Sequence, residues 1–261
     1  MAKKKAVAEA VGGFRGFGSQ ALPFLGALRE NNDRDWFAEN KSTFLEECDA
    51  PLRELVREVG NRLEGEGIPL APIPKNPVFR IYRDVRFSHD KSPYKTNVGS
   101  AFYRDVRFAR DKSPYKTNLG AALHRDGDKS RPGLLYIHVE PKRSFLAAGF
   151  YHPEPPLLKA IRASIAEDQA GFEKMVKGLA TKGLAMGHGE PLARMPKGFE
   201  ALADSPVAEA IRSRSIIVSK PLADDDLERR DLPEVVAQFA TGALPLLEFF
   251  WSRIEDGEGP E

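Results

Sequence analysis

The chain has 261 residues, of which 41% are hydrophobic, so it is long enough to form one large domain with a substantial core. Its 39 basic and 38 acidic side chains nearly cancel, so the overall charge does not indicate binding to nucleic acid or to a membrane surface. The single cysteine, Cys48, excludes an internal disulfide and a cysteine-based metal cluster. We expect neither a signal peptide nor an apolar stretch long enough to span a membrane, and we therefore predict a cytoplasmic protein without a membrane partner.

The first quarter of the sequence predicts helices that follow a disordered tail. Residues 1–16 are small, charged and glycine-rich, without apolar periodicity. Three runs of apolar residues then have helical spacing, separated by Asn31-Asn32-Asp33 and by Asp49 with Pro51. The first run is Leu22, Leu25 and Leu28, the second is Trp36, Phe37, Phe44 and Leu45, and the third is Leu52, Leu55, Val56, Val59 and Leu63. Beyond Gly65 and Gly67, an extended linker without helix is expected from four prolines, Pro69, Pro72, Pro74 and Pro77.

The middle of the chain changes to the period of two that is typical of strands. Phe79, Ile81, Val85 and Phe87 alternate with polar residues, and within this strand Arg83 is the exception on the apolar face. Further strands are expected at Leu134–Glu140 and Ser144–His152, joined as a hairpin by the short turn Pro141-Lys142-Arg143. The middle therefore predicts an antiparallel sheet.

The last part of the sequence predicts mainly helices. Pro155-Pro156 opens one helix, and the other expected elements are a short helix at Phe172–Leu179, a loop at Gly183–Gly198, a strand at Ser215–Val218 and a long helix at Leu232–Ile254 with a kink at Pro245. The order of elements lacks regular strand–helix–strand units. We therefore expect an α+β fold with a central, mainly antiparallel sheet flanked by N-terminal and C-terminal helices, in a single domain over residues 17–254 with a disordered tail at 255–261.

The most distinctive feature is a tandem repeat of 21 residues. Residues 82–102 and 103–123 are identical at 16 of 21 aligned positions, which chance does not produce. Two copies are too few for a stacked repeat array, so we interpret the repeat as a local insertion by duplication. Between Arg80 and Lys116 there are ten basic and four acidic residues, a local charge of +6.

The repeat is also the main candidate for a binding site, because arginine forks hold phosphates and aromatic rings stack on bases. A phosphorylated ligand or nucleic acid is the partner that this composition favours, and the candidate residues are Arg80, Arg83, Asp84, Arg86, Lys91, Tyr94, Lys95, Arg104, Arg107, Lys112, Tyr115 and Lys116. The alternative is structural. Arginines and aspartates alternate on one strand face and could form a surface ladder of ion pairs that only supports the fold.

A second candidate group lies on the predicted strand at Leu134–Glu140. Tyr136, His138 and Glu140 share one face of that strand and could perform acid–base chemistry if the face lines a cleft. The alternative is a solvated sheet surface. The five histidines lack paired metal-ligand spacing, so neither a metal site nor a cofactor is expected.

The sequence resembles the widespread bacterial family catalogued as domain of unknown function 2461. The resemblance is carried by an arginine followed by Arg-Asp-x-Arg-Phe, Asp-Lys and Tyr, which correspond to Arg80, Arg83, Asp84, Arg86, Phe87, Asp90, Lys91 and Tyr94. It extends from about Phe17 to Ile254 through Asn31-Asn32 with Trp36-Phe37, Tyr136 to Pro141, Ser144-Phe145 with Gly149 to Pro156, and Ser215 to Leu222. Family members carry the repeated segment once, and the family implies no catalytic role. In the second copy, Ala101 stands where Arg80 stands relative to the first.

Three functions remain open at the level of sequence. The first is binding of a phosphorylated ligand or nucleic acid through the cationic segment. The second is an enzyme that acts on such a ligand with Asp84, His138 or Glu140 as acid–base groups. The third is a structural or partner-binding module without catalytic activity.

Overall fold

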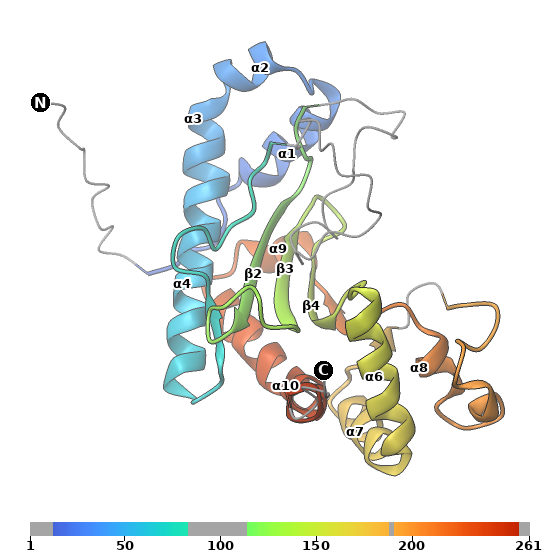
Figure 1. The fold of residues 1–261 in the computed structure, drawn as a ribbon. Coiled ribbons are helices and arrows are strands. Elements are labelled where there is room, and N and C mark those ends of the chain that lie inside the picture. The colour runs from blue at the N-terminus through green and yellow to red at the C-terminus, as the bar shows by residue number, and fades with distance from the viewer. Residues whose placement is uncertain (1–12, 83–113, 188–190, 256–261) are drawn as a thin grey trace, which may run out of the picture.

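The computed structural model describes residues 13–82, 114–187 and 191–255, shown in colour in Figure 1. Within these ranges the chain forms an α+β fold around a six-stranded sheet in which all neighbouring strands are antiparallel. In spatial order the strands are β1 (Leu70–Pro72), β2 (Leu119–Arg125), β3 (Leu134–Val139), β4 (Phe145–Phe150), β6 (Ile216–Pro221) and β5 (Met186–Gly187). The predicted fold class is confirmed.

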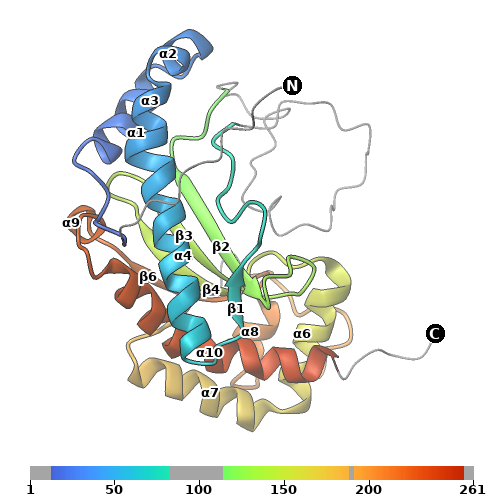
Figure 2. The same ribbon diagram turned by 90° about the vertical axis from the view of Figure 1, so that its left-hand side faces the viewer.

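Helices cover one face of the sheet, as Figures 1 and 2 show. Helix α4 (Ala50–Gly65) runs along β1 and β2. Helix α10 (Leu232–Glu255) packs on β4, on α4 and on the two helices between β4 and β5. The other helical elements are α1 (Ala21–Glu30), α2 (Arg34–Glu39), α3 (Lys41–Thr43), η1 (Phe44–Asp49), α6 (Pro155–Glu167), α7 (Gln169–Thr181), η2 (Glu200–Leu202), α8 (Ala208–Arg212) and α9 (Asp224–Leu227). The main core lies between this layer and the face of the sheet that carries Leu123, Leu135 and Leu146.

The N-terminal helices differ from the prediction in one boundary. Phe44 and Leu45, expected in the second helix, belong to the third, because α3, η1 and α4 follow one another without a break from Lys41 to Gly65. The segment η1 is a π-helix turn, closed by a hydrogen bond from the Ala50 N–H to the Leu45 carbonyl. Pro51 follows directly and has no N–H to donate to the preceding turn, so the wider turn occurs where the regular ladder is already interrupted.

Part of the expected N-terminal tail belongs to the core. Phe14 is buried, its N–H donates to the Glu58 carboxylate on α4, and its ring packs edge-on against Phe17 at 5.9 Å. The Phe17 N–H donates to the Leu227 carbonyl. The sequence could not indicate this because a single aromatic residue among glycines has no periodicity.

The proline-rich linker contains a short strand that was not predicted. β1 lies at the edge of the sheet and pairs Leu70 with Arg125 and Pro72 with Leu123. An edge strand needs hydrogen bonds on one side only, so it accommodates a proline. Burial of Leu70 against the core fixes the strand in place.

The strand expected from Phe79 is irregular in its described part. Phe79 and Ile81 were predicted on one face, but Ile81 is buried in the main core while Phe79 packs against Tyr136 on the opposite face. The Phe79 N–H donates to the Gly120 carbonyl, and the Ile81 carbonyl accepts from the Lys116 N–H. Between these two bonds one segment advances two residues, from Phe79 to Ile81, while its partner runs four residues, from Gly120 back to Lys116. The partner segment therefore bulges, and the alternation of faces is lost. From residue 83 the expected strand lies outside the described residues.

The C-terminal half follows the prediction more closely. β3 and β4 form the expected hairpin, β6 corresponds to the strand predicted at Ser215–Val218, and α6, α7 and α10 correspond to the three predicted helices. The segment Gly183–Gly198, predicted as a loop, includes β5, whose two residues pair with β6 at the opposite edge from β1. Such a short strand has no sequence pattern of its own.

Helix α10 has the predicted bounds to within one residue, but the expectation that no stretch has the apolar length of a membrane span is wrong for it. Its stretch Leu232–Ile254 is sufficient in length and composition to span a membrane, with a mean hydropathy of 1.2, and half of it is buried inside the protein. The same residues supply core side chains, including Phe239, Leu246 and Phe250. A core helix meets this criterion as readily as a membrane span does.

Candidate functional site

The candidate site lies on the face of the sheet opposite the main core. Strand pairing places Gly120, His138 and Phe145 side by side across β2, β3 and β4, and it places Ala122, Tyr136 and Ala147 in the next row. Tyr136 is therefore surrounded by small side chains and forms a second, smaller cluster with Ala122, Leu134 and Ala147, against which Phe79 and Phe145 pack. This face is apolar near Tyr136 and becomes polar toward the end of β3.

Three polar side chains at that end form a hydrogen-bonded chain, here called the Tyr–His–Glu chain. The Tyr136 hydroxyl lies 3.1 Å from His138 Nδ1, and His138 Nε2 lies 3.3 Å from a Glu140 carboxylate oxygen. A carboxylate can only accept, so Nε2 carries the proton of the neutral ring and Nδ1 accepts from the tyrosine hydroxyl. The imidazole is further held by stacking on Phe145 at 4.6 Å.

Burial keeps the histidine and the tyrosine neutral. The pKa of His138 is lowered because burial penalises the charged imidazolium, and the neighbouring Glu140 carboxylate offsets this only in part. The pKa of Tyr136 is raised, mainly by burial and also by the charge of Glu140. At neutral pH the chain therefore consists of a carboxylate, a neutral imidazole with a fixed tautomer and a protonated phenol.

Glu140 is held by residues from two other parts of the chain. Arg29 of α1 lies 3.3 Å from one carboxylate oxygen, and Arg143 of the hairpin turn lies 4.0 Å from the other. The Ser144 hydroxyl accepts from the Glu140 N–H and donates to the Glu140 carbonyl, which fixes the backbone at the end of β3. Most of the Glu140 side chain is shielded, since only 15% of it is exposed.

A glycine provides the space for the tyrosine hydroxyl. A Cβ atom on Gly120 would lie 2.7 Å from the Tyr136 oxygen and 3.1 Å from the Phe79 ring. Any other residue would displace the tyrosine from His138. Gly120 belongs to the second copy of the repeat, and the first copy has Gly99 at the same position.

The second copy of the repeat is attached to this end of the sheet by its Tyr115. The Asn32 side chain makes two hydrogen bonds to the backbone of Tyr115, one to its N–H at 2.9 Å and one from its own amide to the carbonyl at 3.0 Å. The Tyr115 ring stacks on Phe37 at 4.1 Å, and Tyr82 lies against both rings. Asn118 then places its amide 3.5 Å from His138 Nδ1.

Three candidates of the cationic segment belong to the described residues: Arg80, Tyr115 and Lys116. Lys116 is half-buried with its ammonium 5.8 Å from the centre of the Phe79 ring, and Phe79 in turn packs on Tyr136. Arg80 is exposed and precedes the bridge between Tyr82 and Tyr115. The other candidates lie outside the described residues: Arg83, Asp84, Arg86, Lys91, Tyr94, Lys95, Arg104, Arg107 and Lys112. Neither the binding surface nor the ion-pair ladder proposed for them is tested.

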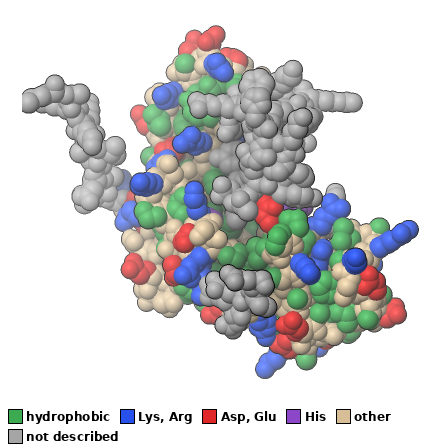
Figure 3. Space-filling model, in the orientation of Figure 1, with side chains coloured by type: hydrophobic (Ala, Val, Ile, Leu, Met, Phe, Trp, Pro, Cys, Tyr) green, Lys and Arg blue, Asp and Glu red, His purple; other side chains and the backbone are tan. Residues whose placement is uncertain are grey.

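The structure adds Arg29, Asn32 and Asn118 to the site. The sequence places Asn32 at the break between two predicted helices and within the family resemblance, but it assigns this residue no role in the site. Nothing in the sequence connects Arg29 with Glu140, which lies 111 positions further along the chain. Among the described residues, no group of three or more histidine, cysteine, aspartate or glutamate side chains could hold a metal ion. On the coloured part of the surface in Figure 3, basic, acidic and hydrophobic side chains are interspersed.

Fold and site together define a class: an α+β protein with one sheet face covered by helices and a partly buried Tyr–His–Glu chain on the other. A family model described as "Conserved hypothetical protein (DUF2461)" matches residues 20–103 and 100–249, so the chain belongs to this family. The two matched segments overlap at residues 100–103, which include the boundary between the copies of the repeat. No curated protein and no solved structure was found to match the chain.

Proposed function

We propose that the protein binds a phosphate-bearing ligand at the end of the sheet that carries the Tyr–His–Glu chain. The observation that supports this most is the position of the two ends of the cationic segment. Tyr82 and Tyr115 pair with each other, with their rings 5.2 Å apart, and Asn118 reaches His138. The cationic sequence between them therefore begins and ends beside this chain.

The chemistry of the segment suits phosphate. Guanidinium groups bind phosphate oxygens in pairs, and lysine supplies a compact positive charge. The described cations of the segment, Arg80 and Lys116, come from the two sides of the Tyr82–Tyr115 bridge. The carboxylate of the Tyr–His–Glu chain, Glu140, is paired with Arg29 and Arg143.

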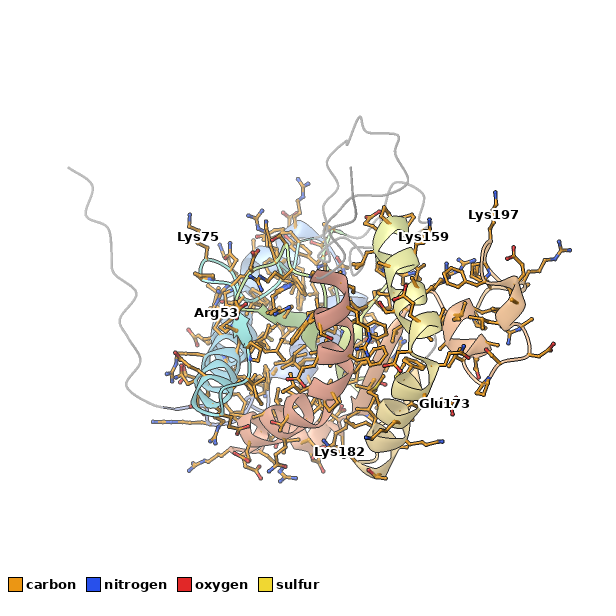
Figure 4. The ribbon with its side chains drawn as sticks, turned by 60° about the horizontal axis from the view of Figure 1, so that its bottom comes forward. Arg53, Lys75, Lys159, Glu173, Lys182 and Lys197 are labelled. Atoms are coloured by element: carbon orange, nitrogen blue, oxygen red, sulfur yellow. The ribbon has the colours of Figure 1, made fainter. Side chains whose placement is uncertain are left out.

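Retention on a phosphate matrix tests this proposal. The Lys116→Gln and Arg80→Gln variants should elute at lower salt than the wild type, because each lost phosphate contact reduces the number of counterions released on binding. The matched control is Lys197→Gln, whose side chain points away from the body of the protein in Figure 4. Inorganic pyrophosphate and a single-stranded oligonucleotide as competitors distinguish a small phosphorylated ligand from nucleic acid.

Two results would contradict binding. One is a wild type that is not retained in a salt-dependent way. The other is a Lys197→Gln variant that loses as much retention as Lys116→Gln, because the effect would then reflect net charge alone. Melting temperatures of the variants control for unfolding.

A second candidate function, an enzyme that acts on the phosphorylated ligand, is supported by the Tyr–His–Glu chain itself. A histidine that stays neutral at physiological pH and is oriented by a carboxylate has the properties of a general base, and clusters of perturbed groups occur at catalytic sites. His138 would be the base, Glu140 would orient it, and Tyr136 would connect it to the apolar part of the face. Asp84, the other acid–base candidate, lies outside the described residues.

Hydrolysis of generic phosphate mono- and diesters tests this candidate. Wild-type turnover that is lost in His138→Gln, with an unchanged melting temperature, supports catalysis. If the wild type binds pyrophosphate but hydrolyses none of these esters, the binding function stands and catalysis of this type is excluded. If binding fails as well, the chain serves as a structural or partner-binding module.

A further inference from the structure

We propose that β2 has a second, less stable register in which the first copy of the repeat replaces the second. The seven residues of β2 correspond, 21 positions earlier, to residues 98–104. The two stretches read Leu-Gly-Ala-Ala-Leu-His-Arg and Val-Gly-Ser-Ala-Phe-Tyr-Arg. This inference goes beyond the proposed function and does not depend on it.

The positions of β2 with special requirements are satisfied by both copies. Glycine is needed at 120 because a Cβ atom would lie 2.7 Å from the Tyr136 hydroxyl, and the first copy has Gly99 there. Arg125 stacks 4.9 Å from the ring centre of Trp251, and the equivalent residue is again an arginine.

The attachment point upstream of β2 also accepts either copy. Asn32 bonds only to the backbone of Tyr115, and Phe37 stacks on a tyrosine ring, which Tyr94 also provides. The sequence from this tyrosine through Asn118 is identical in the first copy, so the neighbours of His138 do not distinguish the two copies.

Four buried positions favour the observed register: three at which the copies differ, and His124, which is 4% exposed and would be replaced by Tyr103. The copies differ at five positions, and three of these lie in β2 at Leu119, Ala121 and Leu123, whose exposures are 4%, 0% and 0%. In the same places the first copy would put a smaller valine, a hydroxyl and a larger phenylalanine. Each of these changes is unfavourable in a close-packed core.

The two registers differ in the length of the segment beside the site. In the observed register 32 residues lie between Tyr82 and the tyrosine bound by Asn32, and in the alternative register 11 residues would lie between them. The extra 21 residues would move to the other end of β2. Exchange between registers would therefore change the cationic segment without changing the contacts of His138.

Disulfide trapping distinguishes the registers. Ala71 of β1 and His124 of β2 are directly paired, and such antiparallel partners are close enough for a disulfide. Ala71→Cys with His124→Cys reports the observed register, and Ala71→Cys with Tyr103→Cys reports the alternative one. Ala71→Cys with Ala109→Cys measures chance collisions, since residue 109 would enter β2 in neither register. The native Cys48 does not compete, because burial and the adjacent carboxylates raise its pKa to about 12.

The decisive comparison adds Val98→Leu, Ser100→Ala and Phe102→Leu, which remove three of the four differences between the two stretches. The fourth, Tyr103 in place of His124, is already absent from the 71–103 pair because residue 103 is the cysteine. After refolding in a thiol–disulfide buffer, the crosslinked fraction of the 71–103 pair should rise by about tenfold or more, because each removed penalty is comparable to a factor of ten in an equilibrium constant. The 71–124 pair should lose a corresponding fraction. If the 71–103 pair stays at the level of the 71–109 pair in this background, β2 has one register and the proposal is wrong.

Discussion

Deletion of one copy or the other gives two proteins of equal length that test how the repeat is accommodated. Deleting residues 82–102 joins Ile81 to Tyr103 and leaves β2 with its present sequence, while deleting residues 103–123 joins Phe102 to His124 and places the first copy in β2. Both products carry the repeated segment once. Their sequences differ only at the five positions where the copies differ.

The structure gives the expected difference between the two deletions. Leu119 to valine removes one buried methylene and costs about 0.5–1.5 kcal/mol. A serine hydroxyl at the fully buried Ala121 position costs about 1–3 kcal/mol if it lacks a partner, and phenylalanine in place of the fully buried Leu123 costs a further ~1–3 kcal/mol. If the three effects add, the free energy of unfolding should be roughly 2.5–7.5 kcal/mol lower after deletion of residues 103–123; neighbours on one strand face couple, so the measured difference departs from the plain sum.

Deletion of residues 82–102 should leave the protein at least as stable as the full chain. The deletion puts Tyr103 in the place of Tyr82 and shortens the segment before Tyr115 from 32 to 11 residues. The lower cost of closing this loop is worth about 1 kcal/mol. Urea denaturation followed by tryptophan fluorescence and circular dichroism measures both differences. The reasoning would be refuted if the two deletions were equally stable, or if deletion of residues 82–102 gave the weaker protein.

Three further predictions concern the surroundings of the site. Burial lowers the pKa of His138, so below about pH 6.5 the unfolded chain binds more protons than the folded one. The free energy of unfolding should therefore fall as the pH drops from about 6.5 to the folded-state pKa. Urea denaturation at a series of pH values should show a flatter dependence for His138→Gln. Gly120→Ala should destabilise by about 1–3 kcal/mol because its Cβ would lie 2.7 Å from a buried phenol oxygen, whereas Gly178→Ala in α7, with open space around it, should be neutral or stabilising; equal melting temperatures would contradict this. Asn32→Ala should cost about 1–3 kcal/mol because it removes two hydrogen bonds to a partly buried backbone, and Asn31→Ala, which removes one exposed bond, should cost less when both are measured by thermal unfolding.

The sequence predicted those elements whose apolar pattern is long. The hairpin of β3 and β4, the helices α6 and α7 and the long helix α10 all follow from periodicity over six or more residues. β1 and β5 could not be predicted because strands of three and two residues are defined by their partners. The exchange of faces between Phe79 and Ile81 also depends on a partner, since the bulge lies in the segment that follows Lys116.

The site was predicted in part. Period-two alternation correctly placed Tyr136, His138 and Glu140 on one face, but it could not show that the face is shielded rather than solvated. Burial of that face depends on Phe79 and Phe145, which reach it from other strands. Arg29 was missed because its contact with Glu140 joins α1 to β3 across 111 residues.

The most direct test of the site is an NMR measurement of the histidine ring nitrogens at neutral pH, with and without inorganic pyrophosphate at low salt. We expect His138 to be neutral, with the proton on Nε2 and none on Nδ1, because Glu140 accepts from the first and Tyr136 donates to the second. Pyrophosphate should shift the His138 signals and leave those of His152 unchanged, since His152 is exposed and follows the opposite end of β4. A His138 ring that titrates like a free imidazole, or that does not respond while the protein binds pyrophosphate, would contradict the proposed site.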